Sequence, residues 1–193
     1  MRIFRRIASA LGGLLILTGC VGMPVQESEK SELRNIFIST EDVSKWTCNP
    51  GKNDVSQTRM EKDGVILYSQ YSFPSVDASK CPVVLDNTLA FFSTEEHSKA
   101  FIDNQISMNI SAKEINGFTV QFYPSNVGGG DDGKYALYLK GEKPHGGMYF
   151  YRKGKSVLLV KTRGVVFDDK SWGMLMIGSL SALDDTTLPH HVE

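Results

Sequence analysis

Long apolar stretches and cysteines are both scarce in this chain of 193 residues. The clearest apolar stretch, Ile7 to Leu17, has about 11 residues, whereas a helix that crosses a bilayer needs roughly 20. Three cysteines are too few for a disulfide-dense miniprotein, and the sequence shows no repeat or low-complexity run. Hydrophobic residues make up 41% and charged residues 22%, as in ordinary globular proteins. We therefore expect a folded globular chain without a permanent membrane span.

The sequence also lacks the common catalytic and metal-binding motifs. It has no H-E-x-x-H, no G-x-S-x-G and no C-x-x-C. No two of its four histidines stand at i, i+4 on a predicted helix. We expect no cofactor and no metal. An enzyme, such as a hydrolase, would need a site that the sequence hides.

One segment, Gly128 to Lys134, matches the G-x-x-x-x-G-K part of a phosphate-binding loop. Tyr135 follows where such a loop has the Ser or Thr that binds magnesium, and residues 135–139 alternate like a strand instead of opening a helix. Asp131 and Asp132 suggest calcium, but two carboxylates are short of the roughly six to eight oxygens that calcium takes. The segment therefore indicates a connection between strands, with ion binding left open.

The first twenty residues have the three parts of an export signal. A basic stretch from Arg2 to Arg6 precedes the apolar stretch, which ends in Leu17-Thr-Gly-Cys20. This ending resembles the lipobox of bacterial lipoproteins: an apolar residue, a small residue, Gly or Ala, then Cys. The resemblance implies that residues 1–19 are a signal peptide and that Cys20 is lipidated and becomes the mature N-terminus. Val21, where an Asp marks inner-membrane retention in many such proteins, implies the outer membrane, with the protein facing the periplasm.

The remaining chain divides into a tether, one domain and a tail. Residues 20–33 are short of large apolar groups, which predicts a lipidated flexible tether with a typical span of about 20 Å. Residues 34–185 are expected to form one globular domain, and residues 186–193 a C-terminal tail. Acyl chains on Cys20 would hold this domain at the membrane.

Two cysteines remain after Cys20 is set aside, Cys48 and Cys81. Export implies an oxidising compartment, and two cysteines allow one intramolecular pairing. We expect a Cys48–Cys81 disulfide that stabilises the fold by roughly 3–4 kcal/mol. Two free thiols and a metal site are the alternatives.

The hydrophobic pattern predicts an α+β fold, a single twisted antiparallel sheet with two helices packed on one face. Ser93 to Glu96 has the form of a capping box and predicts a helix over about 94–107, and a second helix is expected from Asp168 or Asp169 to Leu183. Asn116-Gly117 predicts a hairpin turn. Lys62-Asp63-Gly64 and Lys153-Gly154-Lys155 predict two further tight turns between strands. Strands are expected over 34–39, 57–61, 65–73, 88–92, 110–115, 118–123, 134–140, 148–152 and 156–163. This order resembles that of PsbP/Mog1-type domains, a resemblance that implies no function.

Charge is unevenly distributed along the chain. Between residues 134 and 163, eight basic residues face one acid, a net charge of +7 within a chain whose net charge is −1. Aromatic residues are interleaved with these cations, and a basic aromatic sheet surface suits an anionic partner. The alternative is that the tyrosines pack in the core while the lysines line exposed edges. The candidate binding surface consists of Lys134, Tyr138, Lys140, Tyr149, Tyr151, Arg152, Lys153, Lys155, Lys161 and Arg163.

These observations favour a non-catalytic envelope lipoprotein that binds a protein partner, possibly an acidic one. It would be an accessory subunit of an envelope complex or an immunity-type inhibitor. The location argues against nucleic acid as the partner. The alternatives are a ligand-binding lipoprotein for a lipid headgroup or a glycan, and a hydrolase with a cryptic site.

Overall fold

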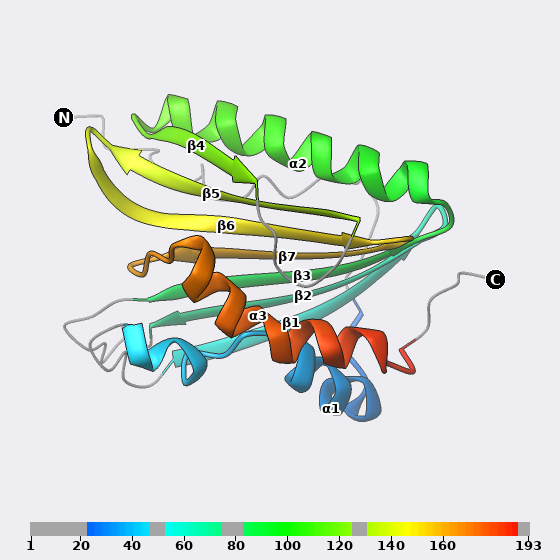
Figure 1. Cartoon of the computed structure of the whole chain (residues 1–193). Helices are drawn as coiled ribbons and strands as arrows, with labels where there is room; N and C mark the ends of the chain where they lie inside the picture. Colours follow the sequence, from blue (N-terminus) through cyan, green and yellow to red (C-terminus); the bar gives the residue numbers. More distant parts are fainter. Residues whose placement is uncertain (1–22, 47–52, 75–82, 125–130, 189–193) are drawn as a thin grey trace, which may run out of the picture.

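One seven-stranded antiparallel sheet organises the chain (Figure 1). The computed structural model describes residues 23–46, 53–74, 83–124 and 131–188. The strand order is β1-β2-β3-β7-β6-β5-β4, and every neighbouring pair is antiparallel. The strands are β1 (Asn53–Lys62), β2 (Val65–Pro74), β3 (Val84–Phe92), β4 (Thr119–Pro124), β5 (Asp132–Lys140), β6 (Lys143–Lys153) and β7 (Ser156–Arg163). The helices are α1 (Glu27–Ile36), the 3₁₀ helix η1 (Asp42–Trp46), α2 (Glu95–Ile115) and α3 (Asp169–Asp184).

Tight turns set the register of the hairpins. Asp63 and Gly64 have φ angles of 52° and 78°, the conformation of a primed two-residue turn, so β1 and β2 pair along all their residues. Gly154, with φ 53°, turns β6 into β7. These hairpins are the ones that the glycine-containing turns of the sequence predict.

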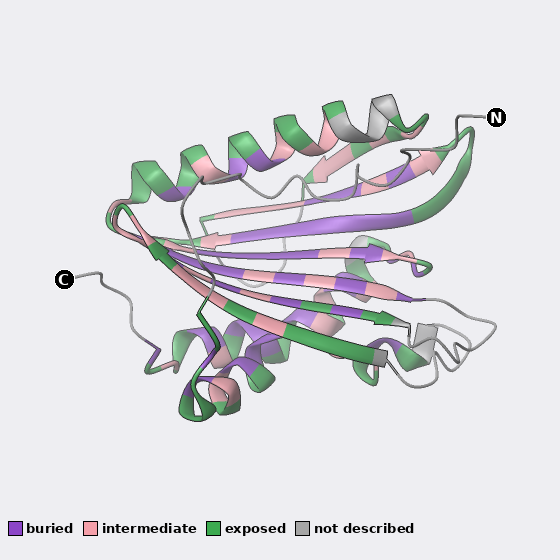
Figure 2. Cartoon of the chain, turned by 180° about the vertical axis from the view of Figure 1, so that it is seen from behind, coloured by how far each residue is buried: buried purple, intermediate pink, exposed green. Residues whose placement is uncertain are grey.

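Helices cover both faces of the sheet. On one face, here called the α3 face, α1 and α3 pack over a core that includes Trp172, Tyr68 and Phe91. On the opposite α2 face, Ile102 of α2 packs over a smaller apolar cluster that includes Phe150. Figure 2 shows that the central strands carry most of the buried residues of the sheet.

The predicted α+β class with a single antiparallel sheet is confirmed. Two helices do share one face, but they are α1 and α3, whereas the two helices predicted from the sequence, α2 and α3, lie on opposite faces. The reason is visible in β7, where residues 157–160 are all buried. Because successive strand residues point to opposite faces, such a run needs cover on both sides.

The folded part begins before residue 34. Instead of a flexible tether followed by a strand, residues 27–36 form α1, whose Leu33 and Ile36 are buried. Glu29 accepts hydrogen bonds from the Gln26 amide and the Tyr68 hydroxyl, which stabilises the start of this otherwise polar helix. The start of the predicted tail also belongs to the fold. Glu32 accepts hydrogen bonds from the hydroxyls of Thr186 and Thr187, and Leu188 is buried.

The Asn116-Gly117 pair ends a helix instead of turning a hairpin. Helix α2 continues to Ile115, so the strand predicted over 110–115 is wrong. Gly117 has φ 74°, the left-handed conformation in which helices commonly end. The following strand, β4, is the second arm of the predicted hairpin.

Several predictions concern residues outside the described part of the chain. They include the signal peptide over 1–19, the lipidated Cys20 and the glycines at 128–130. Cys48 and Cys81 also lie outside the described residues, so their pairing stays a prediction.

Candidate functional site

All three tyrosines of the predicted binding surface are buried: Tyr138, 3% exposed, belongs to the apolar cluster of the α2 face, and the other two belong to the core of the α3 face. Tyr149 and Tyr151 are 0% and 1% exposed and point to the α3 face. The ring of Tyr149 lies 5.1 Å from that of Trp172, centroid to centroid. Their inclusion in a binding surface is therefore corrected: alternate residues of β6 share one face, and that face lies beneath α3.

Two cations of that surface are engaged with carboxylates near the β6–β7 turn. Arg152 lies 3.3 Å from Asp131 and 3.0 Å from Asp132, and its side chain is largely buried. Lys153 contacts Asp184 of α3 at 2.5 Å. Both cations are thus paired with carboxylates of the domain. Because Asp131 and Asp132 already pair with Arg152, their interpretation as calcium ligands is weakened.

Three further lysines are dispersed. Lys140 is exposed at the end of β5, beside the β5–β6 turn, and Lys155 is exposed in the β6–β7 turn at the opposite end of β6. Lys134 is half-buried on β5. The predicted basic surface is thus not one contiguous site, because the two turns lie a strand length apart.

The remaining members, Tyr138, Lys161 and Arg163, come together on the α2 face. Lys161 is the direct cross-strand partner of Asp86, which is in turn the partner of Tyr71. Arg163 and Tyr138 both pair with Gly146, which has no side chain to separate them. We call Tyr71, Asp86, Tyr138, Lys161 and Arg163 the α2-face cluster.

The cluster holds charges in a partly desolvated position. Lys161 Nζ lies 4.0 Å from Asp86 Oδ2, and Arg163 Nη2 donates to Tyr71 Oη at 3.5 Å. Burial raises the pKa of Asp86 and lowers the pKa of Lys161, so each group is penalised in its charged form. Burial also raises the pKa of Tyr138, with the Asp86 charge as a second cause. Two cations and one carboxylate leave an excess of positive charge.

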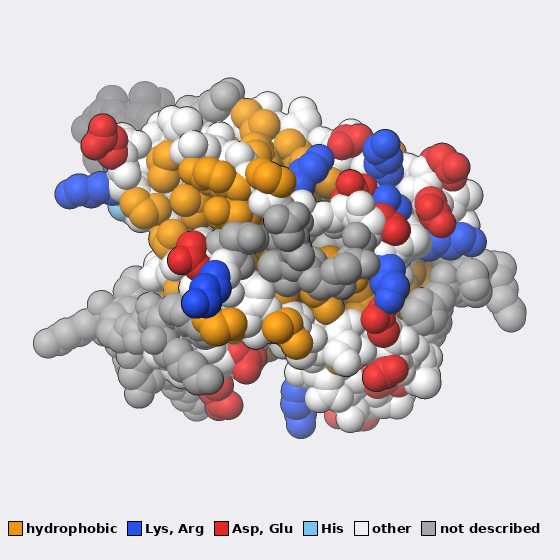
Figure 3. Space-filling view, viewed as in Figure 1, with side chains coloured by type: hydrophobic (Ala, Val, Ile, Leu, Met, Phe, Trp, Pro, Cys, Tyr) orange, Lys and Arg blue, Asp and Glu red, His pale blue; other side chains and the backbone are white. Residues whose placement is uncertain are grey.

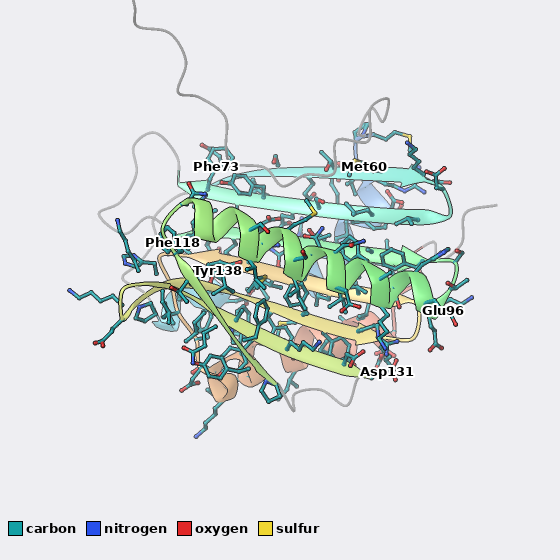
Figure 4. The ribbon with its side chains drawn as sticks, turned by 90° about the horizontal axis from the view of Figure 1, so that it is seen from above. Met60, Phe73, Glu96, Phe118, Asp131 and Tyr138 are labelled. Atoms are coloured by element: carbon teal, nitrogen blue, oxygen red, sulfur yellow. The ribbon has the colours of Figure 1, made fainter. Side chains whose placement is uncertain are left out.

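Exposed aromatic rings adjoin this cluster. Tyr71 and Phe73 stack with centroids 5.4 Å apart, and they remain 38% and 36% exposed. Figure 4, seen from the α2 side, shows Met60 on β1 and Phe73 on β2. We call the α2-facing side of β1 and β2 the β1–β2 wing.

Sequence reasoning missed Tyr71, Phe73 and Asp86. The two aromatics alternate at the end of a predicted strand, and that spacing places them on one face. Their proximity to Arg163 depends on the pairing of β3 with β7, which the local sequence does not encode.

The α3 face carries a groove beside α3. A shallow groove of about 670 Å³ runs between α3 and the segment from α1 to η1, and Met174 and Ile177 are exposed on α3 nearby. Figure 3 shows hydrophobic side chains on this face over the β4–β6 part of the sheet and beside α3. The groove is lined by Arg34, Asn35, Phe37, Ile38, Glu41, Asp42, Met174, Leu175, Gly178 and Ser179.

A histidine-dependent catalytic site finds little support in the described residues. Ser93 Oγ lies 3.2 Å from His97 Nδ1, but both residues are exposed, Ser93 just before α2 and His97 on its first turn. His145 is exposed and packs edge-on against Phe118. Within residues 23–46, 53–74, 83–124 and 131–188, no group of three or more His, Cys, Asp or Glu is placed to hold a metal ion.

Comparisons with known proteins give no further guidance. The chain matches no family model, no curated protein and no solved structure. Among the described helices, none combines the length and apolarity needed to cross a membrane.

Proposed function

We propose that this protein is a lipid-anchored envelope protein whose domain binds an acidic protein partner without catalysis. The lipobox-like ending at Cys20 supports the anchoring. The α2-face cluster and the β1–β2 wing support the binding role. Arg and aromatic side chains are the residue types that most often dominate binding energy at protein interfaces.

One observation carries this proposal. Lys161 and Arg163 are neighbours on one face of β7, and the carboxylate paired with them is Asp86 alone among the described residues. They stand beside the stacked rings of Tyr71 and Phe73, which remain 38% and 36% exposed. A carboxylate from a partner would complete the charge balance, and the rings would supply apolar contact.

The test is charge reversal at the cluster in the native, lipidated protein. We expect Arg163→Glu to weaken the partner by at least about ten-fold, or about 1.4 kcal/mol, as for loss of a central interface cation. Lys155→Glu is the matched control, because Lys155 is exposed in a turn away from the cluster. The partner is found by crosslinking in the envelope, and its affinity for each purified variant is then measured.

Equal affinity of Arg163→Glu and the unaltered protein would overturn the proposed site. A second candidate is an acidic glycan, favoured by the stacked Tyr71–Phe73 pair, which offers a platform for a sugar ring. Calorimetry with an acidic glycan in place of the protein partner separates the two, and Tyr71→Ala would abolish glycan binding.

A further inference from the structure

The N-terminal end of the described chain is fixed to the edge of the sheet. The Met23 amide donates to the Arg59 carbonyl at 2.8 Å, and the Arg59 amide donates to the Met23 carbonyl at 2.9 Å. This is the complete hydrogen-bonded pair of an antiparallel ladder. Met23 is thereby attached to β1, the outermost strand on its side of the sheet.

The residues after Met23 reinforce this attachment. Val25 is buried. Glu29 of α1 accepts a hydrogen bond from the Tyr68 hydroxyl at 2.8 Å, and its carboxylate lies 3.4 Å from Arg59 Nε. Burial and the hydrogen bond to Glu29 raise the pKa of Tyr68 to about 12, so its hydroxyl stays a donor at neutral pH. The chain from Met23 onward therefore belongs to the folded domain.

The chain between the anchor and this edge is very short. Val21 and Gly22 alone separate Cys20 from Met23. Three Cα steps span at most about 11 Å, even when fully extended. If acyl chains hold Cys20 at a bilayer, the β1 edge at Met23 therefore stays within about 11 Å of the lipid headgroups.

We propose that the domain rests on the lipid surface by the β1 edge of its sheet, with Met23 and Val55 as contacting side chains. The proposal rests on the proposed anchoring through Cys20. Met23 is 43% exposed and Val55 is 58% exposed, the latter being the most exposed large apolar residue of the described sheet. Arg59 on the same strand lies 3.4 Å from Glu29 and 2.7 Å from Glu61, so its charge is engaged within the domain.

The opposite edge of the sheet faces away from the membrane in this orientation. Six strand spacings of about 4.8 Å separate β1 from β4, a distance of about 29 Å. Gln121 is exposed on β4 and serves as a distant reference position. The β1–β2 wing opens close to the lipid, so a partner that docks there must itself reach the membrane surface.

The test places a photoreactive phenylalanine at Val55 or at Gln121 in the full-length lipidated protein. Each protein is reconstituted in vesicles of phosphatidylethanolamine and phosphatidylglycerol, illuminated, and examined by mass spectrometry for lipid adducts. We expect adducts at Val55 to exceed those at Gln121 several-fold. Equal yields at the two positions, or no adduct at Val55, would overturn the proposal.

A linker insertion tests whether chain length sets the orientation. A flexible insert of about twelve residues between Gly22 and Met23 adds a typical reach of about 20 Å. We expect it to lower the Val55 adducts several-fold while the protein stays in the membrane pellet. Unchanged adducts would contradict the role of the short chain.

Two further measurements separate this proposal from the proposed function. Cys20→Ser is expected to release the protein from the membrane pellet; retention would overturn the anchoring and this orientation with it. Arg163→Glu is expected to leave the Val55 adducts unchanged while it weakens the partner. Persistent Val55 adducts without any binding at the α2-face cluster would refute the partner role alone.

Discussion

The two faces of the sheet are built from the same strands but carry different chemistry. The α3 face buries Trp172, Tyr68 and Phe91 in one hydrophobic core. The α2 face combines a smaller apolar cluster with Asp86 and Lys161, whose charged forms burial disfavours. The difference indicates that the α3 face supplies stability, whereas the α2-face cluster keeps polar groups that cost stability. Polar groups retained at such a cost are candidates for function.

The sharpest test of this division is removal of the largest buried side chain. Trp172 is 1% exposed and packs against Tyr149 and Phe167, with ring centroids 5.1 and 5.0 Å away. We expect Trp172→Ala to lower the free energy of unfolding by about 3–5 kcal/mol, measured by urea denaturation. Ile177→Ala on the exposed side of α3 is the control and should change it by less than about 0.5 kcal/mol. Similar losses for both variants would contradict the assignment of the α3 face as the main core.

Substitution of Gly146 tests how closely β6 and β7 approach beside the α2-face cluster. A Cβ at Gly146 would lie 2.2 Å from the Thr162 carbonyl oxygen, which is a backbone atom and cannot turn away. We expect Gly146→Ala to destabilise the protein by about 1–3 kcal/mol in thermal unfolding. Gly178→Ala is the counterpart on α3, where nothing lies within 4 Å of the added atom, and it should stabilise by up to about 1 kcal/mol. A harmless Gly146→Ala would show that the β6–β7 pair is looser than described.

The smallest expected effect is a gain in the free energy of unfolding when Asp86 is replaced. Burial raises its pKa, so its contribution to stability is present below the ordinary Asp pKa and is lost as pH rises through the raised value. Asp86→Asn should therefore stabilise the domain at pH 7, by less than about 1 kcal/mol because its side chain is 35% exposed and solvent screens it. The gain should vanish as pH falls through the pKa of Asp86.

Urea denaturation across pH measures this effect, and Asp54→Asn on the exposed side of β1 is the control. Destabilisation by Asp86→Asn at pH 7 would show that the Asp86–Lys161 pair is structural. The α2 face would then resemble the α3 face more closely than we infer.

The fold was predictable where local signals decide it. Asp63-Gly64 and Gly154 turned hairpins as predicted. The apolar run at residues 157–160 of β7 is a local signal for cover on both faces, but the prediction of two helices on one face did not use it. Helix α1 was missed because its sequence, ESEKSELRNI, is mostly polar, and its stability comes from packing against α3 and from the contacts of Glu29 with Tyr68 and Arg59. Asn116-Gly117 favours either a hairpin or a helix end, and only the packing of α2 decides between them.

The candidate site was predictable only in part, for a related reason. Lys161 and Arg163 were included because basic residues are concentrated between residues 134 and 163. Their separation from Arg152 and Lys153, which bind carboxylates of other segments, depends on tertiary neighbours such as Asp132. Sequence shows which residues share a strand face, but it does not show which acids lie opposite them.

The pairing of β3 with β7 governs the order in which the domain can fold. It joins Phe91 to Ser156 and Val84 to Arg163, which are 65 and 79 positions apart in the chain. A chain made from its N-terminus completes β1 to β3 well before β7 exists, so β3 first presents an unpaired edge. Contacts this distant in sequence also slow the search for the native state. Chains that stop before residue 156 are thus expected to expose the unpaired edge of β3 and to aggregate. Truncation should therefore cause more aggregation than single substitutions do.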